Sequence, residues 1–369
     1  MNEWISREEA LARLGVRAQT LYAYVSRGLI GRAADAANPR RSLYRAEDVL
    51  TLERRRARGR GTAAIATGAI AWGEPVVDTA LSTVVRGRLL YRGQDAAALS
   101  ATATLETVKA LLWGGEDAPF PAGDPAGDPF VALASLIGPA SATIGRPVTR
   151  LIADASSAVA TIAGAVGAVG DGPMHHRLAR GWGVDATGAE LIRRALVLLA
   201  DHELNPSTFA ARVAAATGAS LAASLLAGLS ALSGPRHGGA GRATAALAAE
   251  AARDGAEAAV ARWLASGHPL PGFGHPLYPH GDPRAAALLA EVAVEDALCA
   301  LADAVAAATE RLPNIDFALL AMTRAAGLPK DAPFRLFAAA RAVGWAAHAM
   351  EQVASGAAIR PRARYVGVT

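Results

Sequence analysis

The chain has 369 residues, of which 52% are hydrophobic and only 5% aromatic. Its core must therefore consist mainly of Ala, Leu and Val, and because Ala and Leu are strong helix formers we expect an all-α protein. Residues 1–60 hold 13 arginines against 7 acidic residues, whereas the remainder holds 24 basic against 26 acidic residues. The single cysteine, Cys299, excludes an internal disulfide. The polar start MNEWISREEA lacks the pattern of a secretory signal, which favours a cytoplasmic protein.

Residues 1–60 are predicted to form a separate basic module. Ser6 and Glu9 have the spacing of a capping box that opens a first helix, and Gly15 and Gly28 end the first two helices. The loop 33–44 separates the second helix from the third. The three short helices that this pattern predicts are Arg7–Leu14, Ala18–Arg27 and Ala46–Arg58.

The segment LGVRAQTLYAYVSRGLI of this module resembles the start of MerR-like and excisionase-like winged helix-turn-helix domains. The resemblance implies that the second helix enters the DNA major groove and that a wing contacts phosphates. The same fold can also serve only for docking or for support of a dimer. The DNA-facing residues that the resemblance implies are Gln19, Thr20, Tyr22, Tyr24 and Arg27 on the helix, and Arg40 and Arg41 on the wing.

Residues 61–80 read as a connector, and the following segment, Asp78–Gly93, is predicted to be a turn-rich hairpin. An amphipathic helix is expected at Thr104–Trp113, followed by a proline-rich stretch with at least one surface loop at Pro119–Pro147. The loop Asp171–Arg180 carries the paired His175 and His176. It separates two further predicted helices, Thr149–Val169 and Gly188–Leu204.

The stretch Val213–Pro235 carries no charge over 23 residues, which is long enough to cross a bilayer. It is rich in Ala, Ser and Gly, holds only five leucines and has no aromatic belt, so we expect a buried helix in a helical core or at a dimer interface and no membrane span. Beyond it, three more helices are predicted: Ala243–Ser266, Arg284–Glu310 and Pro333–Ser355.

Between the first two of these helices lies Leu270–Ala285, LPGFGHPLYPHGDPRA, whose glycines and prolines exclude a regular helix. Shaped loops on helical scaffolds often carry function. Polar groups at such helix–loop junctions, combined with arginines, indicate a pocket for an anionic small molecule. The candidate residues of this pocket are His202, His237, His275 and Asp316, with Arg284, Arg341 and Arg360.

Several motifs then point to one family. DHELNPSTFAARV, SGPRHGGA, PGFGHPLYPHGDPRA, LPNIDF, ARAVGWAAHAMEQ and IRPRARYVG occur in the order and approximate spacing of the citrate synthase family. The earlier DTALSTV, RLLYRGQDAAAL and ATLETVKALLWGG resemble the N-terminal signature of that family. Residues 75–367 of this chain are therefore similar to a citrate synthase. The chain departs from the common pattern of that family at Pro276 and Gly241, and its stretch between Gly114 and Asp201 is short and loop-rich for the family.

The resemblance implies a helical homodimer or higher homo-oligomer, with a large domain at 61–240 and 340–369 and a small domain at 241–339. It implies condensation of acetyl-CoA with oxaloacetate by an acyltransferase that converts the acyl group into alkyl on transfer. The coenzyme A thioester is then a substrate, with no metal and no permanently bound cofactor.

The family roles suit the chemistry of the matching residues. A thioester methyl is a weak acid, and Asp316 matches the carboxylate base. His237 matches the donor to the thioester oxygen, and His275 matches the group that polarises the 2-oxo carbonyl. The residues that match substrate-binding positions are His202, Arg284, Arg341 and Arg360, the last from the other subunit, and the backbone of Leu270, Pro271, Gly272, Phe273 and Gly274 matches the wall at the adenine end of coenzyme A.

Three alternatives stay open. The body could act on propionyl-CoA as a 2-methylcitrate synthase, because pocket shape sets that choice. The basic module could make the protein a DNA-binding regulator that senses a metabolite. His175, His176 and His280 could bind a metal, although no cysteine or carboxylate lies at ligand spacing.

Overall fold

The structure is a computed structural model, and by internal contacts the chain divides into two compact units. The first unit comprises Met1–Asp78 with Arg360–Thr369, and the second comprises Thr79–Ile359. The large and small domains predicted within the second unit stay a prediction. The residues that the structure describes are 4–14, 16, 18–26, 29–35, 42–51, 77–124, 127–138, 140–361 and 367.

The first unit combines short helices with a small antiparallel sheet of order β1-β3-β2. Helices α1 (Arg7–Leu14) and α2 (Ala18–Ser26) follow β1, and residues 46–51 are helical after β3. The Ser6 hydroxyl accepts a hydrogen bond from the Glu9 amide at 3.1 Å, as the capping pattern predicts. The strands are β1 (Trp4–Ile5), β2 (Arg32–Ala34) and β3 (Ser42–Arg45).

This unit has a hydrophobic core of its own, formed by Ile5, Ala10, Leu14, Leu21, Ile30, Tyr44 and Val49. The predicted separate module is thus present as a packed unit with the predicted first helix and the predicted second helix as far as Ser26. The part of the third predicted helix beyond residue 51 lies outside the described residues.

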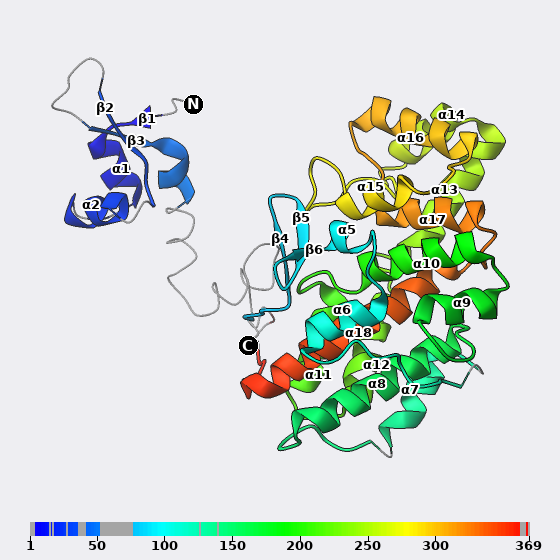
Figure 1. Ribbon diagram of the computed structural model, residues 1–369. Coiled ribbons are helices and arrows are strands. Elements are labelled where there is room, and N and C mark those ends of the chain that lie inside the picture. Colours follow the sequence, from blue (N-terminus) through cyan, green and yellow to red (C-terminus); the bar gives the residue numbers. More distant parts are fainter. Residues whose placement is uncertain are drawn as a thin grey trace. The chain divides into compact units, whose positions relative to one another are not determined.

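The second unit opens with a three-stranded antiparallel sheet and is otherwise helical in its described part (Figure 1). The hairpin β4–β5 pairs Ser82 with Tyr91, which agrees with the predicted turn-rich hairpin. The strands are β4 (Ser82–Val85), β5 (Arg88–Tyr91) and β6 (Gln94–Asp95). The helices are α5 (Ala96–Leu99), α6 (Leu105–Trp113), α7 (Pro129–Ile137), α8 (Val148–Ala165), α9 (Met174–Trp182), α10 (Ala186–Leu199), α11 (Pro206–Ala215), α12 (Leu221–Leu232), α13 (Ala240–Asp254), α14 (Ala256–Ala265), α15 (Pro283–Leu289), α16 (Asp296–Thr309), α17 (Ile315–Ala325) and α18 (Ala332–Ser355).

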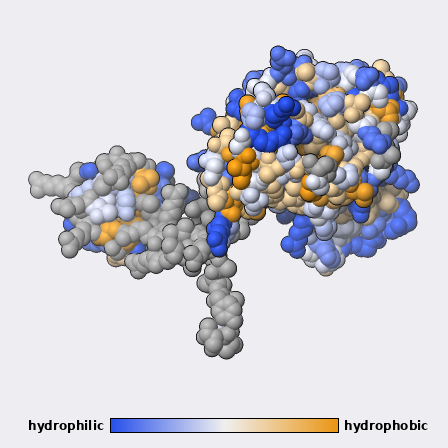
Figure 2. Space-filling model, turned by 90° about the horizontal axis from the view of Figure 1, so that it is seen from below, coloured by the Kyte–Doolittle hydropathy of each residue, from blue (hydrophilic) through white to orange (hydrophobic). Residues whose placement is uncertain are grey.

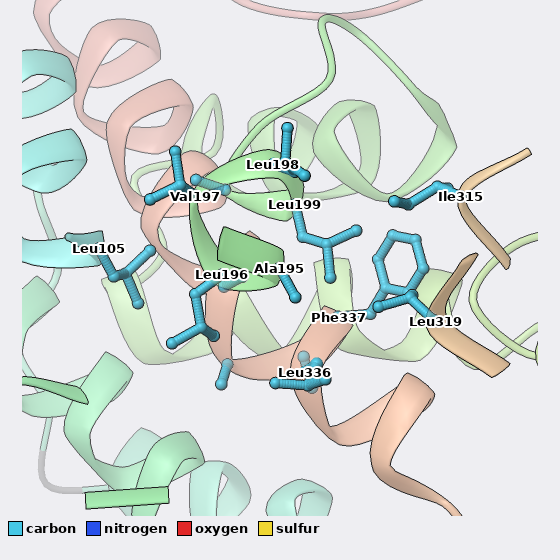
Figure 3. Close-up of a cluster of buried hydrophobic side chains, with 14 of the residues drawn as sticks. Leu105, Ala195, Leu196, Val197, Leu198, Leu199, Ile315, Leu319, Leu336 and Phe337 are labelled. Atoms are coloured by element: carbon cyan, nitrogen blue, oxygen red, sulfur yellow. The ribbon is translucent and has the colours of Figure 1, made fainter. Parts of the chain in front are cut away.

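Helix α18 runs through the middle of this unit, and most of its residues are buried on every side (Figure 1). A helix that is apolar all round needs neighbours all round, and α18 packs against α8, α10, α11 and α12. Figure 3 shows side chains of α10 meeting those of α17 and α18, with Leu199, Leu319 and Phe337 in one cluster. This core fixes the ends of the helices that carry the candidate site.

Three sequence-based predictions for the helices were wrong. The loop predicted at Asp171–Arg180 contains helix α9, which the Glu106 carboxylate on α6 caps by accepting from the Met174 amide at 2.7 Å. The predicted helix Ala243–Ser266 is two helices, because Gly255 has a φ of 92°, a left-handed conformation that breaks the helix. The third is the predicted helix Arg284–Glu310, whereas the stretch Pro119–Pro147 has irregular segments on both sides of helix α7, in line with the predicted surface loop.

The predicted helix Arg284–Glu310 is also two helices, α15 and α16. No glycine or proline marks the break between them. Tertiary packing explains it instead: α15 packs on α10 and α17, whereas α16 packs on α13 and α14. The chain must turn between Leu289 and Asp296 to satisfy both faces.

The uncharged stretch Val213–Pro235 is divided between α11 and α12 by a turn at Gly218, which has a φ of 80°. Both helices contribute side chains to the core, as predicted for a helical core. Among the described residues, no helix combines the length and the apolar character that a bilayer span requires.

Candidate active site

The loop Leu270–Ala285 is fastened to the segment before α17. The Gly274 amide donates to the Leu312 carbonyl at 2.8 Å, and the Asn314 amide donates to the Gly272 carbonyl at 2.9 Å. The Asn314 side chain donates to the Gly274 carbonyl at 3.1 Å. Gly272 and Gly274 have φ values of 86° and 70°, which side-chain-bearing residues rarely adopt. The predicted loop and the predicted base Asp316 are therefore carried by one hydrogen-bonded structure.

Two of the predicted histidines meet at this loop. The rings of His202 and His275 lie edge to face with centroids 5.2 Å apart. The His202 Nε2 and the Tyr278 hydroxyl are 2.8 Å apart, and the Tyr278 ring lies 4.9 Å from that of His275. His202 and Tyr278 are buried, and His275 is half-buried. The structure thus brings the loop histidine and the histidine at the start of the DHELNP motif into one cluster.

Arg284 completes this cluster from the first turn of α15. Its Nε and Nη2 donate to the two carboxylate oxygens of Asp282 at 3.0 and 2.7 Å, and its guanidinium lies 5.4 Å from the centre of the Tyr278 ring. Asp282 also accepts from the amides of Arg284 and Ile315. Burial alone disfavours the Arg284 charge, but the Asp282 carboxylate raises the pKa of Arg284 above its usual value. The site therefore holds a permanent buried cation.

His237 lies at the end of the α12–α13 connection and is half-buried. Its Nε2 is 2.8 Å from the Ser207 hydroxyl, which also accepts from the Trp345 indole at 3.1 Å. The glycines after it are a packing requirement: a Cβ on Gly238 would lie 2.7 Å from Leu232, and one on Gly239 would lie 2.7 Å from the Ser233 carbonyl. The HGG motif therefore lets the chain pass close to the end of α12.

Asp316 occupies the first turn of α17, where its amide donates to the Asn314 side chain at 3.0 Å. The carboxyl group is half-buried. Burial raises its pKa to about 6, against the opposing attraction of the Arg284 guanidinium. A carboxylate with a pKa near neutrality is matched to the task of a general base.

The three histidines are poor bases in this environment. Burial, reinforced by the charges of Arg341 and Arg284, lowers the pKa of His237 to about 4, and burial with Arg284 lowers the pKa of His275 to about 4. The pKa of His202 lies well below its usual value, because of burial and the same two arginines. All three imidazoles are therefore neutral at pH 7 and can donate hydrogen bonds from N–H groups.

The neutrality of His237 and His275 is testable by NMR. We expect their imidazole signals in the folded protein to stay unchanged between pH 5.5 and 8, because their midpoints lie near pH 4. In urea-unfolded protein the same histidines should titrate near the ordinary value of about 6.5. Midpoints near 6.5 in the folded protein would contradict the burial argument.

The remaining candidate residues are placed differently. Arg341 is fully buried on α18, where its Nε donates to the Leu199 carbonyl at 2.7 Å. Burial lowers the pKa of Arg341 to about 10. Arg360 is exposed and belongs to the first unit by contacts, so its role in the site stays a prediction.

A cavity of about 400 Å³ opens beside the loop. Of the five residues predicted to face coenzyme A, Phe273 and Gly274 line it, whereas Leu270 is buried in the hydrophobic core. Pro271 and Gly272 do not line it. The other lining residues are His275, Pro276, Tyr278, Pro279, Gly281, Glu310, Arg311 and Leu312.

The predicted DNA-facing residues are only partly described. Tyr22 is 46% exposed on α2, Thr20 is half-buried, and Tyr24 packs against the core of the first unit. The side chain of Gln19, and all of Arg27, Arg40 and Arg41, lie outside the described residues. The DNA-binding role therefore stays a prediction.

In the described part of the chain, the residues of the alternative metal site do not form a cluster of metal ligands. His175 and His176 lie on α9 with ring centroids 4.1 Å apart, and His280 is exposed on the candidate loop. Within the described ranges, no group of three His, Cys, Asp or Glu side chains is placed to hold a metal ion.

Sequence reasoning missed four residues that shape the site: Tyr278, Asp282, Ser207 and Asn314. All four lie within motifs that had been recognised, and the proximity of Asp282 to Arg284 in the sequence was a usable signal. For Ser207 the motif gave no sign of its contact with His237, because its partners His237 and Trp345 are 30 and 138 residues away.

Comparison with known proteins identifies the family of this fold and site. The family described as "Citrate synthase, C-terminal domain" matches residues 132–362, more than half of the chain. The chain therefore belongs to the citrate synthase family.

Sequence matches to individual relatives extend over about half of the chain. It is 36% identical over 189 residues to citrate synthase 2 of Bacillus subtilis (strain 168), covering 48% of this chain and 51% of the relative. It is 35% identical over 193 residues to the citrate synthase of Haloferax volcanii, covering 48% and 50%. The matched stretch thus spans about half the length of these relatives.

Solved structures share the fold over a longer stretch. A citrate synthase from Thermoplasma acidophilum, in a ternary complex with carboxymethyl coenzyme A and oxaloacetate, superposes with a TM-score of 0.68 at 23% identity, covering 82% of this chain and 96% of that one. A citrate synthase from Thermotoga maritima gives a TM-score of 0.67 at 23% identity, covering 80% and 94%. These likenesses establish a mainly helical citrate synthase fold, preceded by a small sheet-containing unit.

Proposed function

We propose that the second unit condenses a short acyl-CoA, with acetyl-CoA as the first candidate, with oxaloacetate to give citrate and free coenzyme A. The observation that carries the proposal is the cluster of His202, His275 and Arg284, with the raised pKa of Asp316 at the adjoining start of α17. Neutral hydrogen-bond donors and a buried cation suit a dianionic 2-oxo acid. A base with a pKa near 6 suits proton removal from carbon.

The chemistry proceeds by carbon–carbon bond formation. Asp316 accepts a proton from the carbon next to the thioester carbonyl, while His237 donates a hydrogen bond to the thioester oxygen as charge develops there. The carbon nucleophile attacks the 2-oxo carbonyl, which His275 polarises and protonates as it becomes an alcohol. Water then cleaves the thioester, which releases coenzyme A and the carboxylate product.

Ser207 orients the His237 imidazole. The Nε2 of His237 lies 2.8 Å from the Ser207 hydroxyl, which donates its own proton to the Asn205 Oδ1 atom at 2.7 Å and accepts from the Trp345 indole. The hydroxyl oxygen therefore accepts from His237, and the proton of the neutral imidazole lies on Nε2. Donation from Nδ1 to the thioester oxygen requires the Ser207 hydroxyl to turn from Asn205 to Nε2 of His237.

The test is a substrate panel that measures release of coenzyme A with a thiol reagent. Acetyl-CoA and propionyl-CoA are each offered with oxaloacetate, and each is offered alone as the control for simple thioester hydrolysis. Release that requires oxaloacetate supports the condensation. Faster turnover of propionyl-CoA would assign the chain to 2-methylcitrate synthesis, and no oxaloacetate-dependent release from either thioester would reject the proposed function.

The assembly proposed for this enzyme is a homodimer. Figure 2 shows apolar patches on the face of the second unit that lies at the bottom of Figure 1. Val131, Ile144 and Val148, on or near α7 and α8, are among the most exposed large apolar side chains of the described residues. Exposed apolar surface of this kind often marks an interface. Light scattering on the purified chain decides between monomer and dimer.

A second candidate function is DNA binding by the first unit. The observation that favours it is the independent core of residues 4–51, with two short helices followed by an antiparallel strand pair and Tyr22 exposed on the second helix. A gel-shift assay against genomic fragments, with and without oxaloacetate and coenzyme A, tests it. Binding that weakens steeply with salt supports contact with phosphates, and no binding at low salt rejects it.

A further inference from the structure

The position of His202 depends on a turn that a distant strand holds in place. The Ser82 hydroxyl on β4 donates to the Oδ2 atom of Asp201, and the hydroxyl oxygen of Ser82 accepts from the Glu203 amide at 3.0 Å. His202 lies between these two anchored residues. One hydroxyl, 119 residues away along the chain from Asp201, therefore fixes both sides of the histidine that contacts Tyr278.

The turn at residues 201–203 contains a backbone conformation that needs support from its surroundings. Glu203 has a φ of 56°, a left-handed conformation that is unfavourable for a residue with a side chain. Strain of this kind is unfavourable and persists only where the surrounding structure holds the backbone in place. Because this strained backbone adjoins the candidate substrate histidine His202, we expect the strain to serve the function of the site.

The Asp201 side of the turn is equally constrained. Asp201 is fully buried, the Tyr91 hydroxyl donates to its carbonyl at 3.1 Å, and His348 on α18 contacts its Oδ2 atom through Nε2 at 3.2 Å. Gly344 on α18 packs so closely that an added Cβ would lie 2.4 Å from the Asp201 Oδ1 atom. The turn is thus pressed between a strand and the central helix.

The protonation of His348 follows from its other neighbour. The Nδ1 of His348 lies 3.0 Å from Nη1 of Arg212, and a guanidinium can only donate. Nδ1 must therefore accept, which leaves the proton of a neutral imidazole on Nε2, where it is donated to Asp201. Arg212 is in turn paired with Glu351 at 2.6 Å. Ser82 and His348 thus both donate to the same carboxylate oxygen.

We propose that Ser82 is a positioning residue for the candidate oxo-acid site: with Asp201 and His348 it forms a buried clamp that holds the 201–203 turn and sets where the His202 imidazole lies. This inference rests on the proposed function for its kinetic test. The clamp is expected to affect binding of the oxo acid as well as folding, because it holds the backbone on both sides of His202, a histidine of the candidate site.

The test compares Ser82→Ala with Ser224→Ala. Both changes remove a buried serine hydroxyl, but that of Ser224 donates only to the Ser220 carbonyl of its own helix. We expect Ser82→Ala to raise the KM for oxaloacetate by tenfold or more and to change the KM for the acyl-CoA by less than twofold. Ser224→Ala should leave both constants unchanged. Equal changes in both constants with Ser82→Ala, or no change, would overturn the proposal.

A second measurement does not depend on activity. The Glu203 amide donates to a buried hydroxyl, so its hydrogen exchange in the wild-type chain should be slowed at least a hundredfold relative to an unfolded peptide, and the Ser82→Ala change should remove most of that protection. Exchange of the wild-type amide at the unfolded rate overturns the clamp even if the variant does not fold. Absence of coenzyme A release by the wild type, with the amide protected, overturns the proposed function and leaves the clamp standing.

Discussion

Replacing Asp316 by Asn should reduce oxaloacetate-dependent release of coenzyme A by about 10²–10⁴-fold, the contribution typical of a positioned general base. The amide cannot accept the proton from carbon, yet it has the size of the carboxyl group and leaves the Asn314 cap on the backbone amide intact. Asp303→Asn, an exposed change on α16, is the matched control and should leave turnover unchanged. An Asp316→Asn variant with wild-type turnover would exclude Asp316 as the base.

The pH dependence follows from the same carboxyl group. Only the ionised form is a base, so wild-type turnover should fall tenfold for each pH unit below about 6. The histidines cannot produce this limb, because the pKa values of His237 and His275 lie near 4. A limb with its midpoint near 4 would contradict the raised pKa of Asp316, because an unshifted carboxyl group titrates near 3.8.

The contribution of Asp316 to the stability of the fold should fall as the pH rises, whereas turnover should rise with pH. Because burial raises the folded-state pKa of Asp316 above the ordinary value of 3.8, the protonated form is the favoured one in the folded chain. That contribution is fully present below pH 3.8 and is lost as the pH rises through about 6. Asp316→Asn should therefore melt no lower than the wild type at pH 8, so that its lost activity reflects lost chemistry.

Replacing Asp282 by Ala should destabilise the fold by about 3–5 kcal/mol, the cost of removing one partner from a buried ion pair. Arg284 would be left as an uncompensated charge, and Asp282 and Arg284 are both almost fully buried. The change also removes the acceptor for the Arg284 and Ile315 amides at the starts of α15 and α17. Urea unfolding followed by circular dichroism measures the difference.

The control for this change is Asp254→Ala. Asp254 pairs with Arg253 and Arg262 on the surface, where such pairs contribute little. The Arg284 guanidinium lowers the pKa of Asp282 despite its burial, so the Asp282 contribution is present above pH 3.8 and is lost as the pH falls through the lowered value. The gap between wild type and Asp282→Ala should therefore narrow only at strongly acidic pH. If Asp282→Ala lost little stability at pH 7, the Asp282–Arg284 pair would not be desolvated.

Much of the site could be inferred from the sequence because its residues lie in compact motifs. His275 and Arg284 share one glycine- and proline-rich loop, and His202 begins another motif. The structure places all three in one cluster. Helices with clear periodicity and caps, such as α6 with Thr104 at its start, were also predicted to within a residue or two.

The sequence by itself determined the helical class, the separate basic segment at the start, and which residue types could perform the chemistry, because these depend on composition, local propensity and short-range spacing. Tertiary structure alone decided the breaks between α15 and α16, the helix α9 capped by Glu106, and the placing of Ser82 and Ser207 beside site histidines. These features depend on contacts between residues tens to more than a hundred positions apart. Burial likewise sets the pKa values of Asp316 and the histidines, and only the packed core determines burial.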